Sequence, residues 1–364
     1  MKTAVAERFQ VLRRLFKNKG AVLGLAVILL ALFVAVFAYF LAPDGSANAN
    51  RMIPAIANKK PGFTMEFLRV KVQNPVEKTG FWTQLLTGTP DRFKYVPVTK
   101  ATLKGKDYEV MQYIDEDLTT PTRFGRSVVG EPAVVEKTFY LGTDKFGRDI
   151  LSRLMIGTRV SLAVGLIAVL LSLTVGIFLG AVAGYFGGMV DNVVMWLINV
   201  LWSIPTLLLV FALTLALGKG FWQVFIAVGL SLWVSVARLV RGQVMAMKSL
   251  EYVQAASVLG FSHTRIIIRH ILPNILGPVM VIAASNFASA IIIEAGLSFL
   301  GLGVQPPASS WGLMIKENYN FIITSNPALA LIPGAAIMLL VLAFNLLGNG
   351  LRDATDTAAV NTPG

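Results

Sequence analysis

Residues 251–274 read EYVQAASVLGFSHTRIIIRHILPN, a polar stretch between two long apolar segments. A helix is predicted from Lys248, just before this stretch, to Leu259, with Ala255 and Ala256 at its centre. Gly260 follows, and it suits the left-handed backbone conformation that commonly ends a helix. The stretch therefore predicts a short helix-turn-helix whose small side chains allow another protein to approach its backbone closely.

The second half of this stretch is predicted to be a second short helix. Ser262 is placed to cap that helix, and Pro273 is expected to end it before the next apolar run begins. The simpler alternative is an amphipathic hairpin that lies at the membrane surface and has no partner.

The composition predicts a membrane protein. The chain is 55% hydrophobic and only 14% charged, with a mean hydropathy of +0.67, which lies outside the range of soluble domains. A span needs about 20 apolar residues, and six segments are long enough: 20–42, 161–184, 192–217, 222–240, 275–295 and 328–350. The predicted fold is therefore an all-α polytopic membrane protein with six transmembrane helices.

Basic residues predict the orientation of the spans. The first 19 residues carry six Lys or Arg and one acidic residue, so the N-terminus is expected in the cytoplasm. Five further crossings place the loop 241–274 and the C-terminus on the same side. That loop is also basic, with Arg241, Lys248, Arg265 and Arg269 against Glu251.

Residues 44–138 interrupt the apolar pattern with a long polar insertion. The segments 63–72 and 95–103 alternate apolar and polar residues, as half-buried strands do. We expect a small, mostly β, extracytoplasmic subdomain whose aromatic side chains are buried; the alternative is a loosely ordered loop. These aromatic residues are Phe63, Phe67, Phe81, Trp82, Phe93, Tyr95, Tyr108 and Tyr113.

The predicted organisation has four parts. Residues 1–43 hold the cytoplasmic N-terminus and first span, 44–138 the insertion, 139–356 the core with five spans, and 357–364 a tail. Within the core, residues 150–159 have one apolar face and predict a short amphipathic helix in the membrane interface before the second span.

The sequence argues against several classes of function. It has no cysteine, and its two histidines, His263 and His270, lie ~10 Å apart along a helix, too far to share a metal ion. No GxxxxGK[ST] phosphate-binding loop is present. The net charge of +12 is explained by the positive-inside rule rather than by nucleic-acid binding.

A few residues inside the predicted spans are candidates for special roles. Glu294 either faces a pore, or lies near the outer end of its span, where amides of the following loop or a residue of a partner subunit hold it; the second interpretation is favoured. Pro205 and Pro278 are expected to kink their helices. An intramembrane enzyme or a secondary transporter would need histidines, paired acids or inverted repeats at membrane depth, and the sequence shows none convincingly.

Six blocks of sequence carry a resemblance to a known family. They are LGTDKFGRD (141–149), AGYFGG (183–188), ARLVRGQ (237–243), RHILPN (269–274), LSFLGLGVQPP (297–307) and NLLGNGLRD (345–353). Together with the helix-turn-helix they resemble the dipeptide/oligopeptide branch of ABC-importer permeases, and more narrowly its C-type inner-membrane subunit. The resemblance is loose over residues 1–42, dense over 139–356, and does not extend to the insertion.

The resemblance identifies the polar stretch with the EAA loop, which docks on the ATPase in this family. The family pattern is Glu-Ala-Ala, three residues, Gly, nine residues, Ile, any residue, Leu-Pro. Gln254 stands here in place of the Glu and His270 in place of the Ile, so Glu251 is the remaining acidic residue on that face. The implied coupling residues are Glu251, Gln254, Ala255, Ala256, Gly260, Leu272 and Pro273.

The resemblance also implies the partners. The chain would form half of a translocation pore with a homologous permease subunit in a bacterial inner membrane. Two ATPase subunits would supply ATP and Mg²⁺ binding, so the chain itself would be no enzyme and hold no cofactor, and an extracytoplasmic binding protein would deliver the solute. Peptides are the expected substrate, with glutathione or a nickel complex as alternatives.

Overall fold

The computed structural model describes residues 11–355, except 73–79, 116–117, 219 and 324–325. The predicted tail, 357–364, lies outside this range. The chain divides into two compact units. The helical unit contains residues 1–31, 161–304 and 337–364, and the sheet unit contains residues 32–160 and 305–336.

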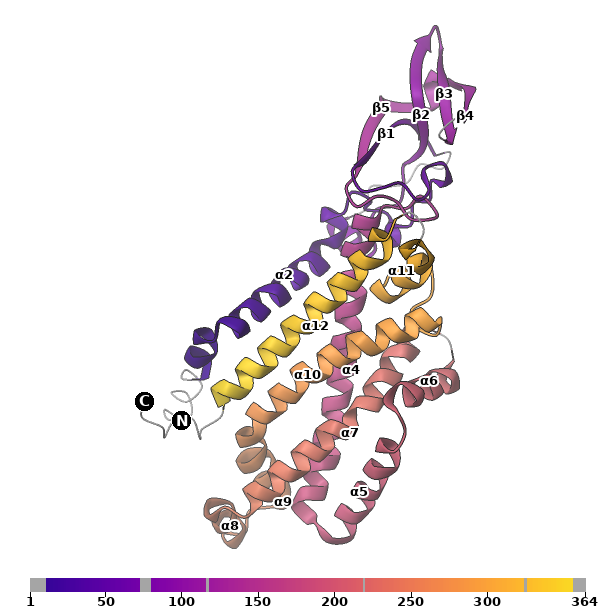
Figure 1. The fold of residues 1–364 in the computed structure, drawn as a ribbon. Helices are drawn as coiled ribbons and strands as arrows, with labels where there is room; N and C mark the ends of the chain where they lie inside the picture. The colour runs from indigo at the N-terminus through magenta and orange to yellow at the C-terminus, as the bar shows by residue number, and fades with distance from the viewer. Residues whose placement is uncertain (1–10, 73–79, 116–117, 219, 324–325, 356–364) are drawn as a thin grey trace. The chain divides into compact units, whose positions relative to one another are not determined.

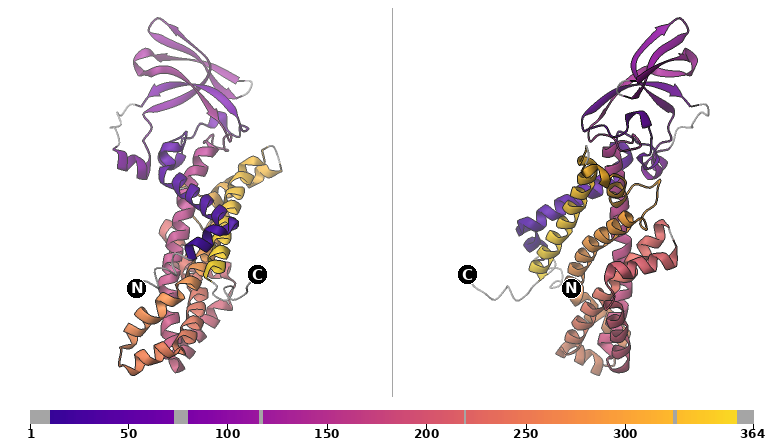
Figure 2. Two further views of the ribbon diagram at one scale, coloured as in Figure 1. Left: turned by 90° about the vertical axis from the view of Figure 1, so that its left-hand side faces the viewer. Right: turned by 45° about the vertical axis from the view of Figure 1, so that its right-hand side comes forward.

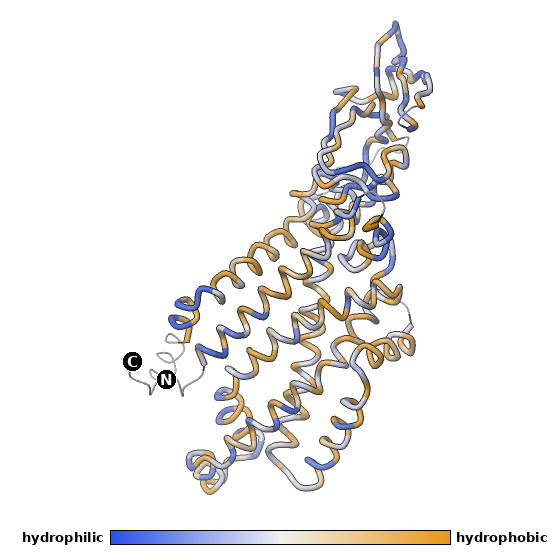
Figure 3. Tube along the Cα trace, in the orientation of Figure 1, coloured by the Kyte–Doolittle hydropathy of each residue, from blue (hydrophilic) through white to orange (hydrophobic). Residues whose placement is uncertain are grey.

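Within the described residues, five helical runs are long and apolar enough to cross a membrane, and their hydrophobic character is visible along the trace (Figure 3). The first four are α2 (Lys19–Leu41), α4 (Ile150–Phe186), α7 (Phe221–Lys248) and α12 (Ala328–Thr355). The fifth, His263–Leu300, ends in α10 (Leu276–Leu300).

The third predicted span, 192–217, is not one continuous helix. It is divided into α5 (Gly188–Trp202) and α6 (Thr206–Leu217), which meet at an angle of 95°. Pro205 is the residue immediately before α6, so the proline predicted to kink the span lies at a complete break. Neither half reaches the ~20 residues of a span, and the two together count as a sixth candidate.

Two other helix predictions need correction. The separate interfacial helix predicted at 150–159 is the first part of α4, which continues without a break to Phe186. Pro278 lies in the first turn of α10, as its third residue, rather than inside the helix. Proline is tolerated in a first turn, where the missing amide has no helical partner to lose.

The helical unit is built around α7, which contacts α5, α6 and α10. Gly176, Gly180 and Gly184 line the face of α4 that packs against α7. A Cβ atom at Gly180 would lie 2.5 Å from the carbonyl oxygen of Ala237. The glycines therefore allow close helix packing, as small residues do in membrane proteins.

The sheet unit contains one five-stranded antiparallel sheet of order β4-β3-β2-β1-β5 (Figures 1 and 2). Its strands are β1 (Phe63–Lys71), β2 (Phe93–Lys104), β3 (Asp107–Asp115), β4 (Leu118–Gly125) and β5 (Val129–Phe139). The two strands expected from alternation, 63–72 and 95–103, are β1 and β2.

Side chains cover both faces of the sheet. Phe67 and Leu68 are adjacent in β1 and point to opposite faces, yet both are fully buried. Phe67 packs with Ile53, Ile56, Tyr113 and Phe139, whereas Leu68 packs with Val96, Val98, Val110 and Val129. The insertion is therefore a small folded module with two apolar clusters rather than a loop.

The expected burial of the aromatic side chains is only partly correct. Phe67 and Tyr113 are buried, and Phe63, Phe93, Tyr95 and Tyr108 are partly buried. Phe81 and Trp82 are exposed in this chain. They lie on α3 (Phe81–Thr87), a short helix between β1 and β2.

The remaining short elements are α8 (Glu251–Val258), α9 (His263–Ile266), a π-helical turn at Ile267–Ile271, a 3-10 turn at Leu272–Ile275 and α11 (Trp311–Asn318). Further 3-10 turns lie at Ala47–Ala49, Pro54–Ile56, Arg126–Val128 and Tyr319–Ile322.

Candidate functional site

The helix-turn-helix predicted at residues 251–274 is present as a compact elbow between α7 and α10. Its first helix, α8, begins at Glu251 rather than Lys248, because Ser249 and Leu250 separate it from α7. Gly260 has φ +78°. Its amide donates to the carbonyl oxygen of Ser257 (3.0 Å), and the amide of Phe261 donates to the carbonyl oxygen of Ala256 (3.2 Å). These two bonds form a Schellman motif, which fixes the turn through backbone contacts.

The two alanines at the centre of α8 face opposite ways. Ala256 is buried with Val253 in an apolar cluster that includes Tyr185, Ile266 and Ile271. Ala255 is exposed, as are Glu251 and Gln254. One face of α8 therefore holds the elbow together while the other is available to a partner.

The tip of the elbow presents large apolar side chains to its surroundings. Val258 is 87% exposed and Leu259 is 74% exposed. Both lie next to the exposed face of α8 and just before the Gly260 turn. Exposed apolar side chains on a rigid turn are typical of a protein-binding surface.

Gln254 makes a bond that the family's Glu could not make. Its Nε2 donates to the carbonyl oxygen of Ser249 at 3.2 Å, and an ionised carboxylate has no proton to donate. The side-chain amide of Gln254 therefore links α8 to the segment between α7 and α8. This local use of Gln254 leaves Glu251 as the exposed carboxylate of α8.

The elbow is braced against the end of α4. The hydroxyl of Tyr185 lies 3.0 Å from Nδ1 of His263, the first residue of α9. Lys248 Nζ donates to the Tyr185 carbonyl at 2.6 Å, and the His263 ring meets the rings of Tyr185 and Phe186 edge-on. A displacement of the elbow would therefore be transmitted to α4.

The remaining residues of the elbow form the connection between α9 and α10. His270 stacks on Phe261 with ring centroids 5.9 Å apart, so each histidine packs against aromatic rings. Leu272 is half-buried against the same apolar cluster, and the exposed Pro273 is the second residue of the 3-10 turn that leads into α10. Pro273 does not end the segment as expected, because the helical run continues from His263 to Leu300. Ser262 precedes α9 but makes no side-chain capping bond, so that prediction was wrong.

Glu294 is fully buried in α10. The Ser298 hydroxyl, one turn later, donates to Glu294 Oε1 at 2.6 Å and accepts from the amide of Val304 at 3.1 Å. Ser298 thus links Glu294 to the amide of Val304 in the loop that follows α10. The choice between a pore-facing and a loop-held Glu294 stays a prediction.

The sheet unit contains a buried ion-pair cluster that the sequence did not reveal. Arg148 and Arg153 both bind Asp144 Oδ2, at 2.6 and 2.8 Å, and both bind Glu317 Oε2 at 2.7 Å. The side chains of the two arginines and Asp144 are at most 2% exposed, and Glu317 is 11% exposed. The cluster joins the 141–149 block and the start of α4 to α11, in which Glu317 lies.

Two glycines allow the chain to approach this cluster closely. Gly142 and Gly147 both have positive φ. A Cβ atom would lie 2.3 Å from the Lys59 carbonyl at Gly142 and 1.9 Å from the Ile53 carbonyl at Gly147. Residues 53–60 therefore pack so closely against the LGTDKFGRD block (141–149) that glycine is required at positions 142 and 147.

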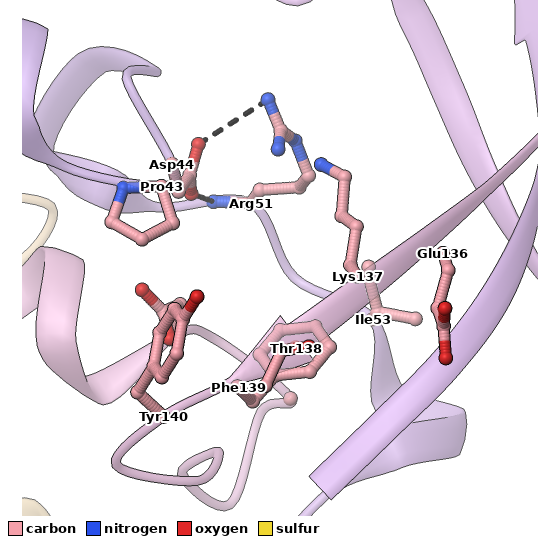
Figure 4. A pocket seen from close by; sticks show the side chains of 11 residues that line it. Pro43, Asp44, Arg51, Ile53, Glu136, Lys137, Thr138, Phe139 and Tyr140 are labelled. Carbon is pink, nitrogen blue, oxygen red and sulfur yellow. Dashed lines mark hydrogen bonds and ion pairs between the residues drawn. The ribbon is translucent and has the colours of Figure 1, made fainter. Parts of the chain in front are cut away.

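A cavity of about 420 Å³ lies at the base of the sheet (Figure 4). Among its lining residues, Arg51 pairs with Asp44 at 3.3 Å, and the ammonium of Lys137 lies 3.6 Å from the ring centroid of Tyr95. Burial, reinforced by repulsion from Arg51, lowers the pKa of Lys137 to about 8. Burial also raises the pKa of Asp149, against hydrogen bonds from Ser152 that lower it.

These charges do not form a metal site. Among the described residues, no group of three His, Asp or Glu side chains is placed to hold a metal ion.

Comparison with known proteins identifies two matching family models. Residues 176–359 match the binding-protein-dependent transport system inner membrane component, and residues 9–61 match the N-terminal TM domain of oligopeptide transport permease C. The glutathione transport system permease protein GsiD of Pectobacterium atrosepticum is 43% identical over 60% of this chain and 72% of its own length. The oligopeptide permease OppC of Escherichia coli K12 is 44% identical over 61% and 73%.

One relative matches almost the whole chain. The dipeptide permease DppC of Lactococcus lactis is 31% identical over 95% of this chain and 89% of its own length. That match extends across the insertion, which the resemblance seen in the sequence did not reach. With one family model matching half of the chain and this relative matching nearly all of it, the chain belongs to the family of inner membrane components of binding-protein-dependent transport systems.

Proposed function

We propose that this chain is a permease subunit of an ATP-driven, binding-protein-dependent importer of di- or oligopeptides. The names of the relatives support this substrate class, since they include dipeptide, oligopeptide and glutathione permeases. Glutathione is the second candidate, because GsiD is among the most similar relatives. The two candidates are separated by measuring uptake of a labelled dipeptide in the presence of excess unlabelled glutathione. Strong inhibition of uptake would favour glutathione, and no inhibition would favour peptides.

The elbow is the proposed coupling element. Its exposed face, with Glu251, Gln254, Ala255 and the apolar tip Val258–Leu259, would dock on an ATPase subunit in the cytoplasm. The observation that carries this proposal is the combination of a rigid, exposed turn with a brace to α4 through Tyr185 and His263. Such a joint converts movement of the partner into movement of a membrane-spanning helix.

The remaining parts follow from this role. Two ATPase subunits would bind ATP and Mg²⁺, because this chain has no phosphate-binding loop. A homologous permease would form the other half of the pore. Both termini would lie in the bacterial cytoplasm, and the sheet would lie outside, where it contacts the binding protein or the sister permease.

Substitutions at Gly260 test the coupling role. No atom lies within 4 Å of a Cβ atom placed there, so a substitution acts through the backbone and not through a clash inside the chain. The left-handed conformation costs an L-residue roughly 1–2 kcal/mol, and β-branched residues are the least tolerant. Gly260→Val should therefore distort the turn and greatly reduce ATP-driven peptide uptake in proteoliposomes.

Gly260→Asn is the matched control, because asparagine adopts the left-handed conformation. It should retain uptake and ATPase assembly. Loss of uptake in both variants would assign the effect to bulk at the surface, and normal uptake in both would overturn the coupling role.

A further inference from the structure

The short helix α3 carries an apolar face that its own unit leaves uncovered. Phe81, Trp82 and Leu86 are 57%, 71% and 63% exposed, and no residue of α3 is buried. Thr83 and Thr87 supply polar groups on the same short helix. Three large apolar side chains exposed together on one helix mark a surface that another phase or molecule covers.

This helix is fixed beside the end of α2. The Phe81 ring stacks on Phe40 with centroids 5.5 Å apart. Arg159 Nη1 donates to the Leu85 carbonyl at 2.8 Å, and its guanidinium lies 4.9 Å from the ring centroid of Tyr39. Gly88 at the end of α3 packs so closely on Tyr39 that a Cβ atom would lie 2.8 Å from the ring.

The apolar face of α3 continues an exposed apolar stripe of α2. In α2, a candidate membrane span, Phe33, Phe37, Phe40 and Leu41 are all exposed and recur at helical spacing. The stacked pair Phe40–Phe81 joins that stripe to α3. Residue 41 is the last of α2, so α3 lies beside the end of this candidate span.

We propose that α3 is an interfacial anchor, with Phe81, Trp82 and Leu86 inserted at the boundary between headgroups and acyl chains. Tryptophan is enriched at this depth because its ring is amphipathic, and short amphipathic helices bind there through one apolar face. The anchor holds the connection between β1 and β2 on the bilayer. A lipid surface is favoured over a protein partner because the patch is continuous with the span.

The absence of cysteine from the chain makes a direct test possible. Trp82→Cys, labelled with an environment-sensitive fluorophore, is measured in the assembled complex in lipid nanodiscs. The reference sites are Leu30→Cys in α2, exposed along the span, and Leu103→Cys in β2, exposed on the sheet. Each labelled protein is challenged with lipid-attached nitroxides at two depths and with aqueous iodide.

The anchor predicts that the residue-82 label is quenched several-fold more by a shallow nitroxide than by iodide. The residue-30 label should respond most to a deep nitroxide, and the residue-103 label should respond to iodide. Quenching of the residue-82 label by iodide alone would show a solvent-exposed helix. Protection from all quenchers would show a protein partner on this face. Either result overturns the proposal.

Discussion

Removal of one carboxylate from the buried ion-pair cluster should lower the stability of the protein. Glu317→Gln keeps the shape of the side chain but leaves Arg148 and Arg153 with Asp144 alone, so the cluster carries one uncompensated positive charge away from water. Removing one partner of a buried ion pair destabilises a protein by about 3–5 kcal/mol. For a unit of about 160 residues, each kcal/mol shifts the melting temperature by about 2–4 °C, so the expected loss is roughly 6–20 °C.

Glu109→Gln is the matched control for this substitution. Glu109 pairs with Lys104 at 2.6 Å and with Arg123 at 2.8 Å on the surface of the sheet, where ion pairs contribute little. We would compare apparent melting temperatures of the purified proteins in nanodiscs, together with protease resistance of the sheet. Equal melting temperatures for the Glu317 and Glu109 variants would refute the reasoning.

A second variant separates charge from shape. Adding Arg153→Met to Glu317→Gln restores neutrality, since Arg148 then faces Asp144 alone. Part of the lost melting temperature should return, because uncompensated charge is the main cost of breaking such a cluster.

Two further predictions concern the sheet unit. Lys137→Met should stabilise the protein by up to about 3 kcal/mol at pH 7, because the folded state lowers the pKa of Lys137 from 10.5 to about 8. Below pH 8 the charged lysine carries its full penalty, and between pH 8 and 10.5 the folded state releases a proton that the unfolded chain still binds. The stability gap between variant and parent, measured by melting, should therefore shrink over that interval; a constant gap contradicts it. Replacing residues 63–139 by a short linker should preserve ATPase assembly, since Gly62 and Phe139 are hydrogen-bonded at 3.0 Å, but should weaken docking of the binding protein. Unchanged docking would show that the insertion does not take part in docking of the binding protein.

The sequence patterns that predicted structure well were local. The alternation in 63–72 and 95–103 identified β1 and β2, and the Gly260 turn has the predicted backbone conformation. Pro205 marked the correct position of a break, but a proline alone does not state whether a helix bends slightly or separates into two helices at 95°.

The features that were missed depend on long-range contacts. Glu317 meets Arg153, a residue 164 positions earlier, and a single glutamate in a short polar helix carries no local sign of such pairing. The burial of Ala256 could have been predicted from the sequence, because its spacing of three from the apolar Val253 places both side chains on one face of α8. In the sequence, Gln254 stood out only as a replacement for the family's Glu, whereas its bond to Ser249 depends on the gap between α7 and α8.

The order of the sheet places β4 and β5 at its two edges, and each of these strands contains a proline, Pro121 in β4 and Pro132 in β5. Proline has no amide hydrogen, so neither edge offers a continuous row of donors to a strand from another molecule. Two copies of the sheet are thus prevented from joining edge to edge. We therefore expect a partner of the sheet to recognise its faces or loops rather than either edge strand.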